Sequence, residues 1–147
     1  MTIHAPVDRV FELFTDFNWS ARHLHKAIKL DFHSQNKSGI GAEWTQIDDE
    51  EGEEVSSLHK VTAFNPPNGY SMTSDDKAAF ETMDFRFVQQ SDGTLTAFDL
   101  TIQPKGFLKG LVLKALKGAV YEAMSEDLHR IKAAIEDQMV SELSGNG

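Results

Sequence analysis

The segment ETMDFRFVQQSDGTLTAFDLTIQP, residues 81–104, limits the possible folds more than any other part of the chain. Apolar residues alternate with polar ones on both sides of Asp92-Gly93, which is the pattern of a β-hairpin with one buried face. A hairpin with one wholly apolar face needs a second layer to cover that face. With Asp92-Gly93 at the turn, the apolar face pairs Met83 with Ile102, Phe85 with Leu100 and Phe87 with Phe98, and the polar face pairs Arg86 with Asp99.

Three further segments show the same alternation. In GAEWTQIDDEEGEEVSSLHKVTAF, residues 41–64, an acidic turn at Glu51-Gly52 predicts a second hairpin. Residues 26–35 and 70–75 predict one strand each, so we expect about five antiparallel strands. The register of the second hairpin pairs Trp44 with His59 and Gln46 with Ser57 on one face, and Glu43 with Lys60 on the other.

The C-terminal part of the chain has helical periodicity instead. From residue 106 to about residue 139, apolar residues recur at steps of three and four, which predicts one long amphipathic helix. Because the sheet needs a cover, we expect a single α+β domain over residues 1–140 in which this helix lies on a curved antiparallel sheet. The last residues, 141–147, predict a disordered tail.

Two short helices are expected near the N-terminus. The first falls in HAPVDRVFELFTDF, residues 4–17, where Pro6 suits the first helical position. The second falls in NWSARHLH, residues 18–25, where Asn18 suits the cap.

Composition and charge exclude several kinds of protein. The chain has 147 residues and no cysteine, which excludes disulfides, thiolate metal sites and a cysteine nucleophile. Its formal charge of −9 repels a phosphate backbone, so we expect no nucleic-acid partner. The sequence shows no secretory signal and no run near the roughly 20 apolar residues of a membrane span, so we expect a cytoplasmic protein. The histidines and carboxylates show no metal-ligand spacing, so neither a metal nor another cofactor is expected.

The order of these elements and several short motifs resemble the START/polyketide-cyclase (SRPBCC) superfamily. The resemblance is strongest to its small bacterial polyketide cyclase/dehydrase and lipid-transport group. It implies a helix-grip fold, in which a curved antiparallel sheet wraps a long C-terminal helix and leaves an apolar cavity. Members of the family usually begin with a strand of several residues, and only MTIH precedes Ala5-Pro6 here, so the first strand is expected to be short or the true start to lie upstream. The motifs that carry the resemblance are APVDRVFELFTDF, GIGAEW, FNPPNGY, DGTLT and LHRIKAAIE.

Alternation in the strands, together with the helix stripe, predicts which residues line such a cavity. Their mixture of apolar bodies and a few polar tips is typical of small-ligand sites, but an ordinary packed core has the same pattern. The predicted lining residues are Trp44, Gln46, Ser57, Tyr70, Met72, Met83, Phe85, Phe87, Phe98, Leu100, Val112 and Leu116.

His59 is the candidate for proton transfer. It shares the inward face with Trp44 and Ser57, where burial would keep the imidazole neutral and available as a general acid or base. A structural histidine satisfied by a neighbouring hydroxyl explains the same pattern. Tyr70 offers a phenol that could orient a carbonyl group, and Glu81 is expected at the cavity mouth.

Two classes of function follow from these residues. The first is a carrier or sensor of a small hydrophobic molecule, such as a lipid, a polyketide or an isoprenoid. The second is a cyclase or dehydratase that uses His59, with Tyr70 or Glu81, as general acid and base. A regulatory or chaperone-linked domain that acts through its outer face is a third alternative. Four lysines without an intervening acid also predict transient contact with anionic membranes; these are Lys105, Lys109, Lys114 and Lys117.

Overall fold

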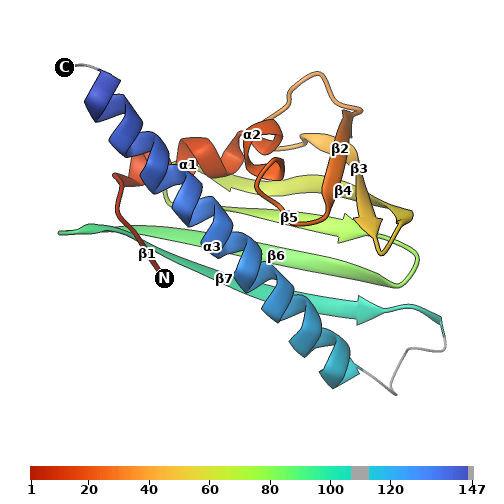
Figure 1. The fold of residues 1–147 in the computed structure, drawn as a ribbon. Coiled ribbons are helices and arrows are strands. Elements are labelled where there is room, and N and C mark those ends of the chain that lie inside the picture. The colour runs from red at the N-terminus through yellow and green to blue at the C-terminus, as the bar shows by residue number, and fades with distance from the viewer. Residues whose placement is uncertain (107–112, 146–147) are drawn as a thin grey trace.

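The computed structural model describes residues 1–106 and 113–145, except for the side chains of residues 113 and 114. Within these described residues, seven antiparallel strands form one sheet in the order β1-β7-β6-β5-β4-β3-β2 (Figure 1). The elements are β1 (Thr2–Ile3), α1 (Val7–Thr15), α2 (Phe17–Ala21), β2 (Ala27–Phe32), β3 (Glu43–Glu50), β4 (Glu53–Asn65), β5 (Gly69–Asp75), β6 (Ala79–Gln90), β7 (Gly93–Pro104) and α3 (Leu113–Gly145).

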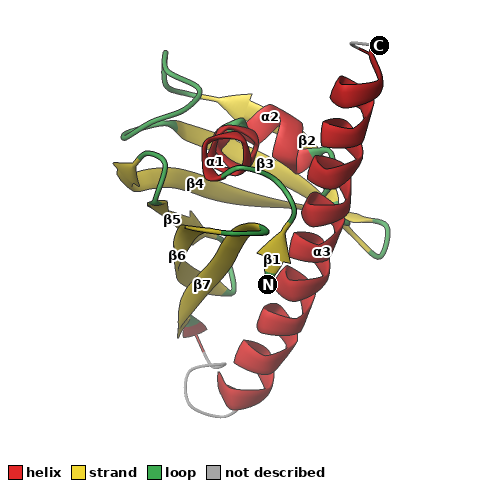
Figure 2. Ribbon diagram, turned by 90° about the vertical axis from the view of Figure 1, so that its left-hand side faces the viewer, coloured by secondary structure: helices red, strands yellow, loops and turns green. Residues whose placement is uncertain are grey.

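The sheet curves around the long helix α3, which crosses it diagonally in Figure 1. Figure 2 shows α1 end-on, between the sheet and the C-terminal half of α3. This arrangement confirms the predicted α+β class, with two short helices near the N-terminus and one long C-terminal helix. None of the helices in the described part of the chain is long and apolar enough to span a membrane.

The predicted register of the β3–β4 hairpin is confirmed. Trp44 pairs with His59, and the Gln46–Ser57 and Glu43–Lys60 pairs also form as expected. Glu51 and Gly52 occupy the turn with φ values of 54° and 89°, which is the conformation that two-residue hairpin turns prefer.

The predicted register of the β6–β7 hairpin is wrong by two residues. Phe85 pairs with Phe98 rather than with Leu100, because Gln90 pairs with Gly93 and the turn therefore falls on Ser91-Asp92. An even shift leaves every side chain on its expected face. The remaining predicted partners change in the same way, since Met83 pairs with Leu100 and Phe87 with Thr96.

The ion pair expected from the wrong register nevertheless forms. Arg86 pairs with Ala97, so Asp99 is its diagonal neighbour across the two strands. The Arg86 Nη1 atom donates to the Asp99 carboxylate at 2.5 Å. A long side chain can reach a diagonal position, so an opposite-charge pair alone does not define a register.

Two predicted helix boundaries also need correction. Asp16 caps α2, because its carboxylate accepts a hydrogen bond from the backbone N–H of Trp19 at 3.1 Å, whereas Asn18 lies inside the helix. Pro6 is the residue before the first helical position of α1.

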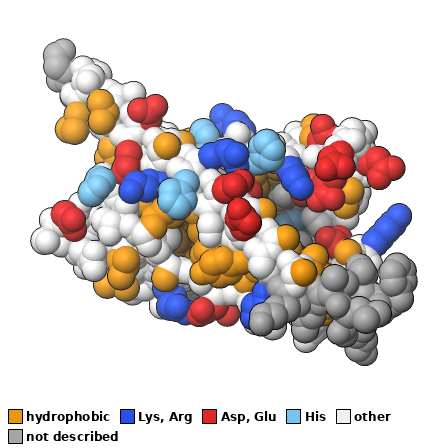
Figure 3. Space-filling view, turned by 60° about the horizontal axis from the view of Figure 1, so that its bottom comes forward, with side chains coloured by type: hydrophobic (Ala, Val, Ile, Leu, Met, Phe, Trp, Pro, Cys, Tyr) orange, Lys and Arg blue, Asp and Glu red, His pale blue; other side chains and the backbone are white. Residues whose placement is uncertain are grey.

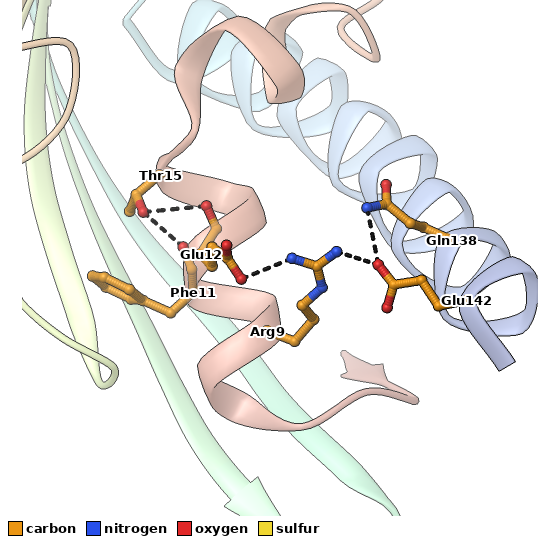
Figure 4. A network of polar contacts seen from close by, with 6 residues as sticks. All are labelled: Arg9, Phe11, Glu12, Thr15, Gln138 and Glu142. Atoms are coloured by element: carbon orange, nitrogen blue, oxygen red, sulfur yellow. Dashed lines mark hydrogen bonds and ion pairs between the residues drawn. The ribbon is translucent and has the colours of Figure 1, made fainter. Parts of the chain in front are cut away.

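The helix α3 continues through Gly145, so the predicted tail is helical over residues 141–145. Figure 4 shows the contact that fixes this end of the helix: Arg9 of α1 lies between Glu12 and Glu142 and forms an ion pair with each. Gln138 also donates to Glu142 at 3.4 Å. Residues 146–147 lie outside the described part of the chain.

The two halves of α3 differ in burial. Leu128, Ile131 and Ile135 are buried in the core, whereas no residue from 115 to 127 is buried. The N-terminal half contributes only partly buried side chains, among them Val120 and Met124. The helix is therefore anchored by its C-terminal half, and its N-terminal half covers a space above the sheet.

Gly118 lies in this N-terminal half, and its replacement should strengthen the helix. A Cβ atom added there would meet no atom within 4 Å. We expect Gly118→Ala to raise the free energy of unfolding by about 0.5–1 kcal/mol, because alanine loses less backbone entropy than glycine on folding. Urea unfolding measures the change, and Ala115→Gly, at an exposed position of the same helix, should produce a loss of similar size.

Candidate functional site

A cavity of about 650 Å³ lies between the concave face of the sheet, the short helices and the N-terminal half of α3. Cavities of this size hold small organic ligands. Side chains from every layer of the fold contribute to its wall. The predicted residues that line it are Trp44, Gln46, Ser57, His59, Tyr70, Met72, Glu81, Met83 and Phe85.

Four predicted lining residues lie elsewhere in the described structure. Phe87 is in the packed core, with its ring 5.0 Å from that of Phe14, and Leu100 is buried in the same core. Phe98 stacks on Tyr121 of α3 at 4.8 Å. Leu116 packs against the core without lining the cavity. The twelfth predicted residue, Val112, is outside the described residues.

The floor of the cavity is aromatic. Phe17 of α2 packs on Trp44 of β3 with ring centroids 4.5 Å apart, and Tyr70 of β5 stacks on Phe85 of β6 at 4.8 Å. Phe14 of α1 also lines the cavity. The short helices therefore supply part of the floor, a contribution that alternation within the strands could not indicate.

One row of side chains crosses this floor. Register places Trp44, His59, Ser74 and Glu81 side by side on β3, β4, β5 and β6. The imidazole of His59 lies parallel to the indole of Trp44, with 5.4 Å between ring centroids and 7° between planes. The row brings two titratable groups, one on each side of Ser74, to the same wall of the cavity.

His59 has one satisfied ring nitrogen and one free one. Its side chain is 8% exposed, and Nε2 lies 2.8 Å from the hydroxyl oxygen of Ser57. Nδ1 is buried and has no hydrogen-bond partner among the described residues. Burial lowers the pKa of His59 to about 4, although the negative charge of Asp76 opposes the shift. The imidazole is therefore neutral at physiological pH.

Glu81 has the opposite perturbation. Burial raises the pKa of its carboxyl group to about 7, and the nearby negative charge of Asp76 adds to the effect. Both protonation states of Glu81 are thus populated near neutral pH. Burial also raises the pKa of Tyr70, so its phenol stays protonated and can act only through hydrogen bonds.

The rim of the cavity is acidic, which the sequence analysis did not predict. Asp48 and Glu50 of β3, Asp76 after β5, and Glu122 and Glu126 of α3 all line it. Figure 3 shows acidic side chains gathered beside a hollow on one face of the molecule. One signal was present in the sequence, since Asp48 continues the inward alternation of Trp44 and Gln46. The helix carboxylates join the rim only through the tertiary fold.

The described residues contain no group of three or more histidine, aspartate or glutamate side chains placed to hold a metal ion. His23 and His25 both follow the end of α2 and share no partner in the described structure. His23 packs on Trp19, with ring centroids 4.6 Å apart, and the backbone N–H of His25 donates to Asp127 at 3.0 Å. The second contact ties the α2–β2 loop to α3 beside the cavity.

The four lysines proposed for membrane contact do not form one described surface. Lys105 is engaged by Asp75, with which it forms an ion pair, and by the backbone carbonyl oxygen of Asp76 at 2.7 Å. Lys117 is exposed on α3. Lys109 and the side chain of Lys114 lie outside the described part of the chain.

A curved antiparallel sheet wrapped around a long C-terminal helix, with an apolar cavity between them, defines a helix-grip domain of the SRPBCC or Bet v 1-like superfamily, and the predicted resemblance is confirmed. Proteins with this fold typically bind hydrophobic ligands. Within the superfamily, the chain belongs to the activator of Hsp90 ATPase homolog 1-like family, whose sequence model matches residues 4–136. A search of curated protein sequences finds no match.

Several solved structures share this fold at low sequence identity. Ara h 8.0201 superposes with a TM-score of 0.78 at 14% identity, over 92% of this chain and 93% of that one. The Zhui aromatase/cyclase from Streptomyces sp. R1128 has a TM-score of 0.74 at 14% identity, over 95% and 92% of the two chains. The di-domain ARO/CYC StfQ from the steffimycin biosynthetic pathway has a TM-score of 0.77 at 13% identity, over 95% of this chain and 50% of that one. At these identities the similarity shows the fold alone.

Proposed function

We propose that the protein binds a small hydrophobic molecule, such as a lipid, a polyketide or an isoprenoid, in the cavity between sheet and helix, as a carrier or sensor. The observation that carries this proposal is the cavity of about 650 Å³ with an aromatic floor. Trp44, Tyr70 and Phe85 present apolar surface, and binding is favourable when a ligand displaces water from it. A few polar side chains, His59 and Gln46 among them, then orient the ligand.

The covering half of α3 suits the entry and exit of a ligand. Val120 and Met124 line the cavity from the helix without being buried. Because few apolar contacts hold this half, its displacement costs less than displacement of the half anchored by Leu128 and Ile135. The gate would then lie on the side of the cavity away from α1.

A fluorescent apolar probe tests the cavity directly. Ser74 is 7% exposed and points into the cavity, whereas its neighbour Thr73 faces the other side of the sheet. We expect N-phenyl-1-naphthylamine to bind the wild-type protein with increased fluorescence, and Ser74→Phe to weaken binding by about fivefold or more, because overlap with the new ring costs at least about 1 kcal/mol.

The matched control is Thr73→Phe, which adds the same ring on the outer face and should leave probe binding unchanged. Equal binding by the wild type and Ser74→Phe would place the probe outside the cavity and contradict the proposal. Native mass spectrometry of the protein purified from its own host, followed by extraction of any bound molecule, then identifies the natural ligand.

A cyclase or dehydratase is the second candidate function. It is favoured by one observation: His59 and Glu81 lie on the same row, and burial moves their pKa values in opposite directions. A neutral imidazole can accept a proton while a protonated carboxyl group donates one, which is the pairing that acid–base catalysis requires. His59→Gln should then abolish turnover of an identified ligand without unfolding the protein; unchanged turnover would remove His59 from the mechanism.

Two further features of the proposal concern location. The protein is proposed to be cytoplasmic, a location that the absence of cysteine suits. Loading from an anionic membrane would use Lys117 and the neighbouring lysines. Co-sedimentation with anionic vesicles at low salt tests this contact, and equal sedimentation with neutral vesicles would contradict it.

A further inference from the structure

The charges around the cavity specify what kind of hydrophobic ligand it takes. We propose that the ligand joins an apolar body to a protonated amine, with the body on the aromatic floor and the ammonium group at the acidic rim beside Glu81. This inference rests on the proposed function, since it requires that the cavity be a ligand site.

The rim carries more carboxylates than cations. The two Lys and Arg side chains among the described lining residues are already paired: Lys26 lies 3.7 Å from Glu50, and Arg130 lies 2.7 Å from Asp127. Among the described residues, no cation pairs with the other carboxylates of the lining, which are Asp48, Asp76, Glu81, Glu122 and Glu126.

Two of these carboxylates are held in place by the protein. Asp76 accepts hydrogen bonds from the backbone N–H groups of Ala78 and Ala79, at 2.7 and 2.9 Å. Asp48 accepts one from the side-chain amide of Gln46 at 3.0 Å. Lys105 binds the backbone carbonyl of Asp76 but does not line the cavity. The negative potential of the rim is therefore fixed in position before a ligand arrives.

His59 supplies an independent indication of a polar ligand group. Its side chain is 8% exposed, lines the cavity, and leaves Nδ1 without a partner in the described structure. A buried ring nitrogen without a hydrogen bond costs about 1–3 kcal/mol, which a bound ligand would recover. When Nε2 carries the proton and donates to the Ser57 hydroxyl, Nδ1 is an acceptor for an N–H group of the ligand.

The alternatives fit these residues less well. A fatty acid would place its carboxylate among several like charges, which raises its free energy in the cavity. An uncharged ligand would hold Glu81 in its protonated form beside Asp76 and would leave the other rim carboxylates without a cation. An ammonium group beside Glu81 removes both problems.

Competition against N-phenyl-1-naphthylamine, which is uncharged near neutral pH, separates the ligand classes. The competitors are decylamine, decanol and decanoate, which share an apolar chain and differ in charge. At a pH near 8, where Glu81 is ionised, we expect decylamine to bind at least about tenfold more tightly than decanoate, with decanol between them. Glu81→Gln should reduce the preference for the amine by about fivefold.

The controls make each outcome decisive. Glu54→Gln removes one charge from an exposed position outside the cavity and should keep the wild-type preference. The double substitution of Glu122→Gln and Glu126→Gln, on the exposed side of α3, should also reduce the preference without disturbing the core. Equal binding of the three competitors, or equal behaviour of Glu81→Gln and Glu54→Gln, would overturn the amine inference while leaving the ligand site intact. Failure of the probe and of all three competitors to bind would overturn the proposed function itself.

Discussion

Gly93→Ala is expected to lower the free energy of unfolding by about 3 kcal/mol and to separate β1 from the edge of the sheet. Gly93 begins β7 with a φ of 151°, and a Cβ atom added there would lie 2.3 Å from the carbonyl oxygen of Ile3. The same Cβ atom would lie 3.1 Å from the Cα atom of His4. Because both obstacles are backbone atoms, no side-chain rotation relieves the contact, and β1 itself must move.

Movement of β1 has a high cost because its few contacts are buried. It pairs with β7 through only two residue pairs, Thr2 with Leu95 and Ile3 with Thr94. Ile3 is 0% exposed, and the Thr94 hydroxyl donates to the carbonyl oxygen of Ala5 at 2.8 Å. Urea unfolding measures the loss, and amide hydrogen exchange shows whether it is centred on β1.

Gly52→Ala is the matched control. Gly52 also has a positive φ, of 89°, but an added Cβ atom would meet nothing within 4 Å. We expect Gly52→Ala to cost about 1 kcal/mol, from backbone conformation alone. If the two variants lost the same stability, the close approach of β1 to Gly93 would not contribute.

The contrast between these two glycines also explains how far the sequence predicts the fold. Gly52 has the role that hairpin rules assign to a glycine at a turn, so the β3–β4 register follows from the sequence. Gly93 is needed instead where β1 passes close to β7, and a contact between residues so far apart in the chain leaves no local pattern. Because Gly93 is the first residue of β7 rather than part of the turn, the turn falls on Ser91-Asp92, and the predicted register is wrong.

The candidate site divides in the same way. Trp44, His59 and Met83 could be predicted to face inward because strict alternation defines the faces of a strand. Apart from Asp48, the rim could not be predicted, since Asp76 lies in the β5–β6 loop and Glu126 on a helix whose placement depends on the whole domain. The raised pKa of Glu81 also depends on burial by other elements and on its nearness to Asp76.

His59→Gln and Glu81→Gln are expected to reveal two opposite pH dependences that oppose each other in the wild-type protein. The pKa of His59 is lowered from 6.5 to about 4. Between about pH 4 and pH 6.5 the unfolded chain takes up a proton that the folded protein does not. The contribution of His59 to the free energy of unfolding is therefore fully present above pH 6.5 and is lost as the pH falls through about 4. Its full size is about 3 kcal/mol, at about 1.4 kcal/mol for each pKa unit.

Glu81 acts in the other direction over nearly the same range. Its pKa is raised from 4.5 to about 7, so the folded protein keeps a proton that the unfolded chain loses. Its contribution is present below 4.5 and is lost as the pH rises through 7. Because its carboxyl group is partly solvated, we expect about 1–2 kcal/mol rather than the full value.

Urea unfolding across this pH range separates the two contributions. Relative to the wild type, Glu81→Gln should gain stability with rising pH, and His59→Gln should lose it. Slopes are compared rather than absolute values, because His59→Gln also breaks the contact with Ser57. The matched controls are His33→Gln and Glu54→Gln at exposed positions. If these controls changed the slope as much as His59→Gln and Glu81→Gln do, the assignment to burial would be contradicted.

An amine ligand changes this balance in a way that a neutral ligand cannot. A bound ammonium group beside Glu81 favours the ionised carboxylate and so lowers its pKa toward the ordinary value. Decylamine should therefore stabilise the wild-type protein more near pH 8 than near pH 5, whereas decanol should stabilise it about equally at both. In Glu81→Gln the difference between the two pH values should shrink, because the group that couples amine binding to proton release is gone.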